Sequence, residues 1–237
     1  MNRQLKRWFR VFLFGGIIGV LATMLRKNFF PQVTDQDFLR MYFIFAPIFI
    51  FGVLMINLFF ARKKYRALNA LTPLAKTEPK RYIEEAEKQL QIIKNPSVRE
   101  IAKINIGAAY CNLEDYESAR EIMENIDTRR LHIQNLFVYQ LDLAYVYFNL
   151  GEEEKGIEVY EEFSGKILPM TKKIASKELN ALLKINEVYY RAAKKDVEKA
   201  EQVYLKSKEL LMSAKEQKDI DKLEKRLKSL REQKEQV

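Results

Sequence analysis

The feature that most constrains this chain is an uncharged run of 21 residues over 41–61. At 1.5 Å per residue a helix of this length measures about 30 Å, which matches the hydrocarbon thickness of a bilayer. A core helix of a soluble domain would normally show a polar face over such a length, and this run has none. The run therefore predicts a transmembrane helix.

An earlier apolar run predicts a further, shorter span. Residues 11–25 contain no charged residue and are flanked by arginines, whose long side chains can reach the membrane interface. A cleaved signal peptide is the alternative, but no clear small-x-small cleavage motif precedes Arg26. We expect an uncleaved helix over about 9–25, which forms a two-helix transmembrane hairpin with residues 41–61.

The positive charge of the chain is concentrated beside these two runs. The net charge is +9; residues 1–66 hold 11 Lys and Arg against two acidic residues, and residues 67–237 hold 30 of each. Basic clusters precede the first run and follow the second, so the positive-inside rule predicts that both termini are cytoplasmic. The charge therefore predicts an integral, multi-pass protein of the cell membrane, in contact with lipid, and argues against nucleic acid as a partner.

The first run contains the small-xxx-small pair Gly15 and Gly19, which favours close packing between membrane helices. We expect this face to pack on the second span, and a homo-oligomer formed through the same face is the alternative. Neither run contains Asp, Glu, Lys or His, which argues against an ion pathway. Residues 1–66 are interpreted as a membrane anchor.

The remaining residues predict helices throughout, so the expected fold class is all-α. Glycine and proline are sparse, and no alternation typical of strands occurs. Residues 67–99 are expected to form a linker with a degenerate first helix pair. Three similar stretches follow, at 104–126, 141–163 and 184–207.

Aligning the three stretches superposes small residues on small ones and bulky residues on bulky ones, except that the third stretch has Val188 at the small position and Arg191 at the aromatic position of its first helix. Two helices approach closely only where one side chain is nearly absent, and a large side chain then fills the adjoining gap. The small residues are Gly107, Ala144, Ala119, Gly156 and Ala200, and the larger residues beside them are Tyr110, Tyr147, Met123, Tyr160 and Tyr204.

This pattern resembles the tetratricopeptide repeat (TPR), a pair of antiparallel helices with small residues where they cross. The resemblance covers roughly residues 100–207 and implies a TPR-like domain over 100–212, with generic helical hairpins as the alternative. The helix-connecting glycine of the family is present as Gly151 but is replaced by Glu114 and Lys195. The terminal proline is missing, and the repeats are offset by 37 and 44 residues instead of about 34.

The resemblance implies a largely apolar groove lined by the first helix of each repeat. It lacks the Lys, Asn and Arg set with which chaperone-binding relatives hold a terminal carboxylate, so that function is not expected. An amphipathic helix or peptide of a partner protein, or the C-terminal helix of this chain, would cover the groove. The implied partner-binding residues are Ile101, Ile104, Ala108, Asn112, Leu141, Tyr145, Phe148, Asn149, Ile185 and Tyr189.

Residues 213–237 predict a charged C-terminal helix with a single apolar stripe. Ile220, Leu223, Leu227 and Leu230 recur at intervals of three or four residues. Two heptads are too few to predict a coiled coil. The helix therefore either packs on the last repeat as a cap, fills the groove, or mediates dimerisation.

The sequence offers no constellation of catalytic or metal-binding residues. His132 and Cys111 are the only histidine and cysteine and lie 21 positions apart, which disfavours a nucleophilic pair and a metal cluster. We therefore expect no enzyme activity, metal or cofactor. The expected function is a membrane-anchored TPR-like scaffold or adaptor for partner proteins; the alternative is an accessory subunit of a membrane complex, engaged through its transmembrane hairpin.

Overall fold

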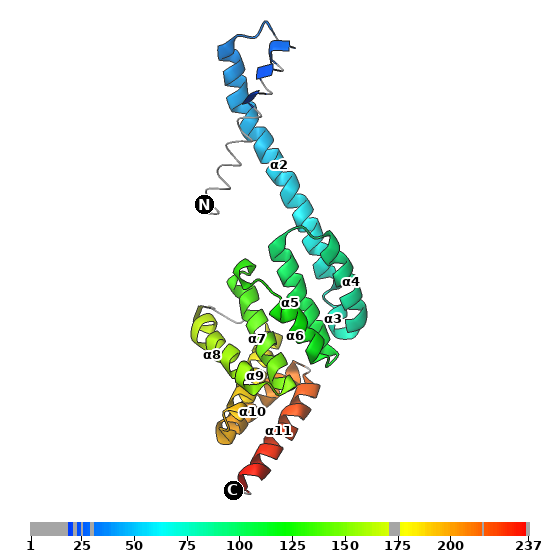
Figure 1. Cartoon of the computed structure of the whole chain (residues 1–237), viewed down its shortest axis with the longest axis vertical. Helices are drawn as coiled ribbons and strands as arrows, with labels where there is room; N and C mark the ends of the chain where they lie inside the picture. Colours follow the sequence, from blue (N-terminus) through cyan, green and yellow to red (C-terminus); the bar gives the residue numbers. More distant parts are fainter. Residues whose placement is uncertain are drawn as a thin grey trace. The chain divides into compact units, whose positions relative to one another are not determined.

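The structure is a computed structural model that describes residues 19–20, 23–24, 26–28, 31–170, 176–214 and 216–235. In this part of the chain every regular element is helical, and no strand occurs (Figure 1). The expected all-α class is therefore confirmed. Residues 1–62 and 63–237 form two separate compact units.

In the first unit the dominant element is the helix α2 (Asp35–Leu71), which continues past residue 62. Its segment Gln36–Ile56 is long and apolar enough to cross a membrane, and none of it is buried. It is the one such segment among the described residues, and it lies about five residues before the predicted 41–61. Most of the predicted first span, including Gly15, lies outside the described residues, so the transmembrane hairpin stays a prediction.

The second unit consists of helices that pack mainly on their sequence neighbours. Three hairpins follow one another, α5 with α6, α7 with α8, and α9 with α10, and α4 packs against the first of them. The helices are α3 (Leu74–Thr77), α4 (Pro79–Ile92), α5 (Pro96–Asn112), α6 (Tyr116–Glu124), α7 (Ile133–Leu150), α8 (Glu153–Glu162), α9 (Lys177–Ala193), α10 (Val197–Ser213) and α11 (Gln217–Glu235). Short helical turns are η1 (Thr128–Arg130), η2 (Phe163–Ile167) and η3 (Leu168–Met170).

The three hairpins share one turn geometry. Each turn contains one residue in the left-handed region, with φ of 62° at Glu114, 77° at Gly151 and 59° at Lys195. The amide of the next residue then donates to the carbonyl five positions earlier, a bond that ends a helix in the Schellman manner. Glutamate and lysine thus adopt the conformation that glycine adopts in the middle hairpin, although a Cβ makes it less favourable.

Two glycines lie where the helices of a hairpin approach most closely. A Cβ added to Gly107 of α5 would lie 2.5 Å from Met123 Cε of α6, and one added to Gly156 of α8 would lie 2.6 Å from Phe148 Cε1 of α7. Ala119, Ala144 and Ala200 are fully buried. The small residues of the sequence pattern therefore permit close contact between helices.

Candidate functional site

The C-terminal helix α11 packs its apolar stripe against the helical hairpins of its own chain. Ile220, Leu223 and Leu227 are buried, and Leu230 is partly buried beside them. They share one hydrophobic cluster with residues of α7, α9 and α10. The stripe is therefore occupied within the chain, as expected for a helix that caps the repeats or fills the groove.

This packing determines where the predicted groove residues lie. Five of them share the buried cluster that α11 joins: Leu141, Tyr145, Phe148, Ile185 and Tyr189. Ile104 is buried in a different cluster, together with Met123 and Val146. The other four are less buried: Ile101, Ala108 and Asn149 are partly exposed, and Asn112 is exposed and donates to the Ala75 carbonyl at 2.8 Å.

Polar contacts also join α11 to α7 and to α6. Tyr145 Oη donates to Asp219 Oδ1 at 2.6 Å, and Lys222 Nζ donates to Tyr116 Oη at 2.6 Å. Burial raises the pKa of Asp219, and burial together with the Asp219 carboxylate raises the pKa of Tyr145. Tyr145, predicted to contact a partner, thus has its hydroxyl satisfied inside the chain.

Ion pairs surround the edges of α11. They join it to α8, α10 and the turn between α5 and α6, but most of the groups are exposed, and such pairs contribute at most about 1 kcal/mol each. The apolar stripe therefore provides most of the stabilisation. The pairs are Arg226–Glu153, Lys222–Glu114, Lys218–Glu114, Lys208–Glu224, Arg231–Glu201 and Lys234–Glu198.

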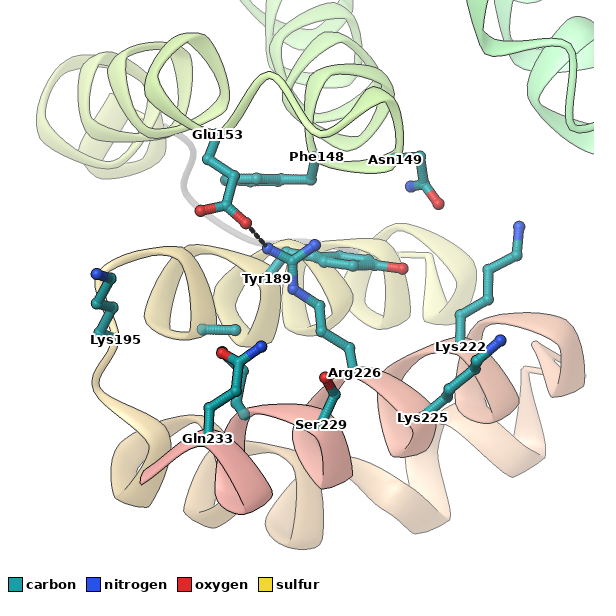
Figure 2. Close-up of a pocket in the computed structure, with 12 residues that line it drawn as sticks. Phe148, Asn149, Glu153, Tyr189, Lys195, Lys222, Lys225, Arg226, Ser229 and Gln233 are labelled. Atoms are coloured by element: carbon teal, nitrogen blue, oxygen red, sulfur yellow. Dashed lines mark hydrogen bonds and ion pairs between the residues drawn. The ribbon is translucent and has the colours of Figure 1, made fainter. Parts of the chain in front are cut away.

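Beside this contact a pocket of about 540 Å³ opens between the end of α7, the end of α9 and α11 (Figure 2). Its apolar wall contains Phe148 and Tyr189, whose rings stack with centroids 5.8 Å apart and an interplanar angle of 11°. The guanidinium of Arg226 lies 5.2 Å from the centre of the Tyr189 ring and pairs with Glu153. Ligand pockets often combine an apolar wall with a few placed polar groups in this way.

The charged lining of the pocket is mainly basic. Lys195 extends from the turn after α9, and Lys222, Lys225 and Arg226 extend from α11, whereas Glu153 is the one carboxylate among the lining residues. Three of the predicted groove residues, Phe148, Asn149 and Tyr189, line this pocket, whereas its basic residues were not predicted because binding was assigned to the repeats alone. The signal was present in the spacing of Lys222, Lys225 and Arg226, which places all three on one side of a helix.

Two ionisable groups with raised pKa values, Asp142 and Cys111, lie outside the pocket lining. Burial raises the pKa of Asp142 to about 7. Burial, together with the nearby carboxylates of Asp142 and Asp219, raises the pKa of the Cys111 thiol. A thiol of this kind stays protonated at neutral pH and is a poor nucleophile. In the described part of the chain no group of three His, Cys, Asp or Glu side chains is placed to hold a metal ion.

The chain matches no protein-family model, and no curated protein or solved structure matches it. The resemblance to tetratricopeptide repeats therefore depends on the residues of this chain alone. In the part of the chain that the structure describes, these observations define a helical protein with one apolar segment of membrane-spanning length and a basic pocket beside α11.

Proposed function

We propose that this protein is a membrane-anchored, TPR-like adaptor that binds partner proteins at the cytoplasmic face of a membrane. The exposed apolar segment Gln36–Ile56 supports the anchor. The three consecutive hairpins with a common turn geometry support the repeat interpretation. Tethering would confine the binding surface to the membrane and raise its effective concentration for nearby partners.

The orientation in this proposal comes from charge. Arg62, Lys63, Lys64 and Arg66 follow the apolar segment, and clusters of this kind are retained on the cytoplasmic side. With a first span over about 9–25, both termini would be cytoplasmic and the protein would be multi-pass.

The single observation that carries partner binding is the open pocket beside α11. The apolar face predicted to bind a partner is covered by Ile220, Leu223 and Leu227. A partner that binds without displacing α11 would therefore use the pocket, where the polar side chains of Lys195, Lys225 and Ser229 are exposed.

Site-specific photo-cross-linking in intact membranes tests this proposal. A photoreactive residue replaces Ser229, which is exposed and lines the pocket; the matched control replaces Ser213, which is also exposed and lies outside the lining. We expect the Ser229 position to capture a defined protein that the Ser213 position does not. If both positions capture the same proteins, or if neither captures any, the adaptor proposal is wrong.

The same assay separates the adaptor from an accessory subunit engaged through its membrane segment. Residues 1–62 are exchanged for an unrelated membrane anchor of the same topology. An adaptor keeps its captured partner after the exchange, because the pocket is unchanged. Loss of capture by a folded domain would instead indicate that the membrane segment makes the specific contact.

A further inference from the structure

We infer that the pocket between α7, α9 and α11 binds an acidic peptide segment of a partner protein, in which carboxylates alternate with apolar side chains. This inference rests on the proposed function and specifies the chemistry of the partner. The charge balance of the pocket, the spread of its cations and its apolar side chains support it.

The charge balance leaves cations available for a ligand. Arg226 is already paired with Glu153, and Lys222 lies 3.5 Å from a Glu114 carboxylate oxygen. Lys195 and Lys225 have no ion-pair partner among the described residues and are exposed. A bound anion would therefore gain attraction from these two lysines without breaking an existing pair.

The cations are spread along the pocket and do not converge on one point. Lys195 lies at one end, Lys222 and Lys225 lie at the other, and Arg226 lies between them (Figure 2). A single phosphate group is held best by donors that surround one position. This arrangement instead favours an extended chain that presents several carboxylates in succession.

An apolar surface lies between the two ends. Leu230 is its partly exposed side chain, whereas the stacked rings of Phe148 and Tyr189 and the methyl group of Ala192 lie beneath it, 1%, 3% and 2% exposed. An apolar side chain of the ligand could cover this surface, while the carboxylates on either side of it face the lysines. Burial of apolar area would supply affinity and the charges would supply selectivity and a faster association rate.

A peptide-binding assay with the full chain tests this inference. The protein is placed in nanodiscs of uncharged phosphatidylcholine, and the probe is a fluorescein-labelled eight-residue peptide of alternating Glu and Leu. A second probe carries Gln in place of each Glu. We expect saturable binding of the Glu peptide, at least tenfold weaker binding of the Gln peptide, and weaker binding of the Glu peptide as salt increases.

Charge reversal locates the binding. In the variant Lys195→Glu with Lys225→Glu we expect affinity for the Glu peptide to fall at least tenfold. The matched control is Lys80→Glu with Lys206→Glu, which has the same net charge and alters two exposed lysines outside the pocket. The control should bind within about twofold of the wild type. Circular dichroism and thermal unfolding verify that both variants are folded.

Three results would overturn the inference: equal binding of the Glu and Gln peptides, equal loss in the pocket and control variants, or no saturable binding. Preferential binding of phosphatidylserine vesicles or inorganic phosphate, lost on reversal of Lys195 and Lys225, would show that the pocket recognises phosphate and would also overturn it. If the Ser229 cross-link still captures a partner in those cases, the adaptor proposal survives; if that capture fails too, both fail.

Discussion

The helices α2 and α11 differ in whether their apolar side chains are exposed or buried. α2 is 37 residues long, and its aromatic and aliphatic side chains are exposed on all sides, with Phe43 71% and Phe49 67% exposed. α11 is 19 residues long and mostly charged, yet its Leu223 is completely buried. The comparison teaches that the arrangement of apolar residues, more than their number, decides what covers a helix.

The physical reason lies in the helical repeat. A stripe at intervals of three and four residues covers one side of a helix, so neighbouring protein can bury it while the other sides remain in water. Apolar residues on every side need an apolar environment on every side. None of Gln36–Ile56 is buried among the described residues, and the segment is long and apolar enough to cross a membrane.

The largest expected effect comes from substitutions that interrupt the apolar segment of α2. Replacing both Ile44 and Ile48 by arginine should raise the free energy of membrane insertion by about 5–7 kcal/mol, because each arginine near the centre of a span raises it by about 2.5–3.5 kcal/mol. The measurement is the membrane-spanning fraction of a reporter protein that carries residues 31–66. The control places Leu at both positions, and unchanged insertion of the arginine variant would contradict assignment of α2 as a span.

The second prediction concerns a substitution that weakens the packing of α11 on the hairpins. Leu223→Ala should lower the free energy of unfolding by about 2–5 kcal/mol, because it leaves a cavity in the cluster shared with α7, α9 and α10. Urea unfolding of the full chain in detergent micelles, followed by far-UV circular dichroism, measures the loss. The control is Lys228→Ala on the exposed side of α11, which should change the free energy by less than about 0.5 kcal/mol. Equal effects in both variants would show that the stripe does not hold the helix.

The third prediction sharpens the view of packing beneath α11. Gly156→Ala should destabilise the protein by about 1–3 kcal/mol, since the added Cβ overlaps the rigid ring of Phe148, which also lines the pocket. Gly107→Ala meets mainly the flexible end of Met123 and should cost less. Thermal unfolding of the two variants in parallel tests the order, and a larger loss at Gly107 would contradict it.

A more gradual effect is the pH dependence of stability that the buried Asp142 carboxyl group introduces. Since the pKa of Asp142 is raised to about 7 in the folded state, the folded chain binds a proton that the unfolded chain has released between about pH 4 and pH 7. Stability should therefore fall across this window as pH rises, by at most about 1.4 kcal/mol per pH unit, and level off above it.

Asp142→Asn should remove this part of the slope. Urea unfolding at pH 5, 6, 7 and 8 provides the comparison, and the difference between variant and wild type should grow up to about pH 7 in favour of the variant. A constant difference at all four values would show that Asp142 keeps an ordinary pKa in the folded protein.

Local patterns predicted much of the fold. The uncharged run predicted the apolar part of α2, the small residues predicted close approaches such as Gly156 against Phe148, and the stripe of α11 predicted a buried face. Each of these depends on residues within one or two helices, for which periodicity and side-chain size are sufficient.

The pocket could not be predicted in the same way. It combines Phe148, Lys195 and Lys225, which are far apart in sequence and come together only through the packing of α7, α9 and α11. The apolar stripe of α11 favoured capping of the last repeat, and groove filling and dimerisation were the alternatives. The positive φ angles of Glu114 and Lys195 were also not indicated by their residue types, because ordinary side chains disfavour that conformation.

The sequence by itself determined that this protein is helical, that one segment needs an apolar environment on all sides, and that the C-terminal helix has one face to bury. These properties follow from charge, side-chain size and the helical repeat. Tertiary structure decided that α11 covers Tyr145 and Tyr189 and that its cations form a pocket with Lys195. That outcome depends on which faces are complementary in shape, and complementarity exists only when distant helices are packed together.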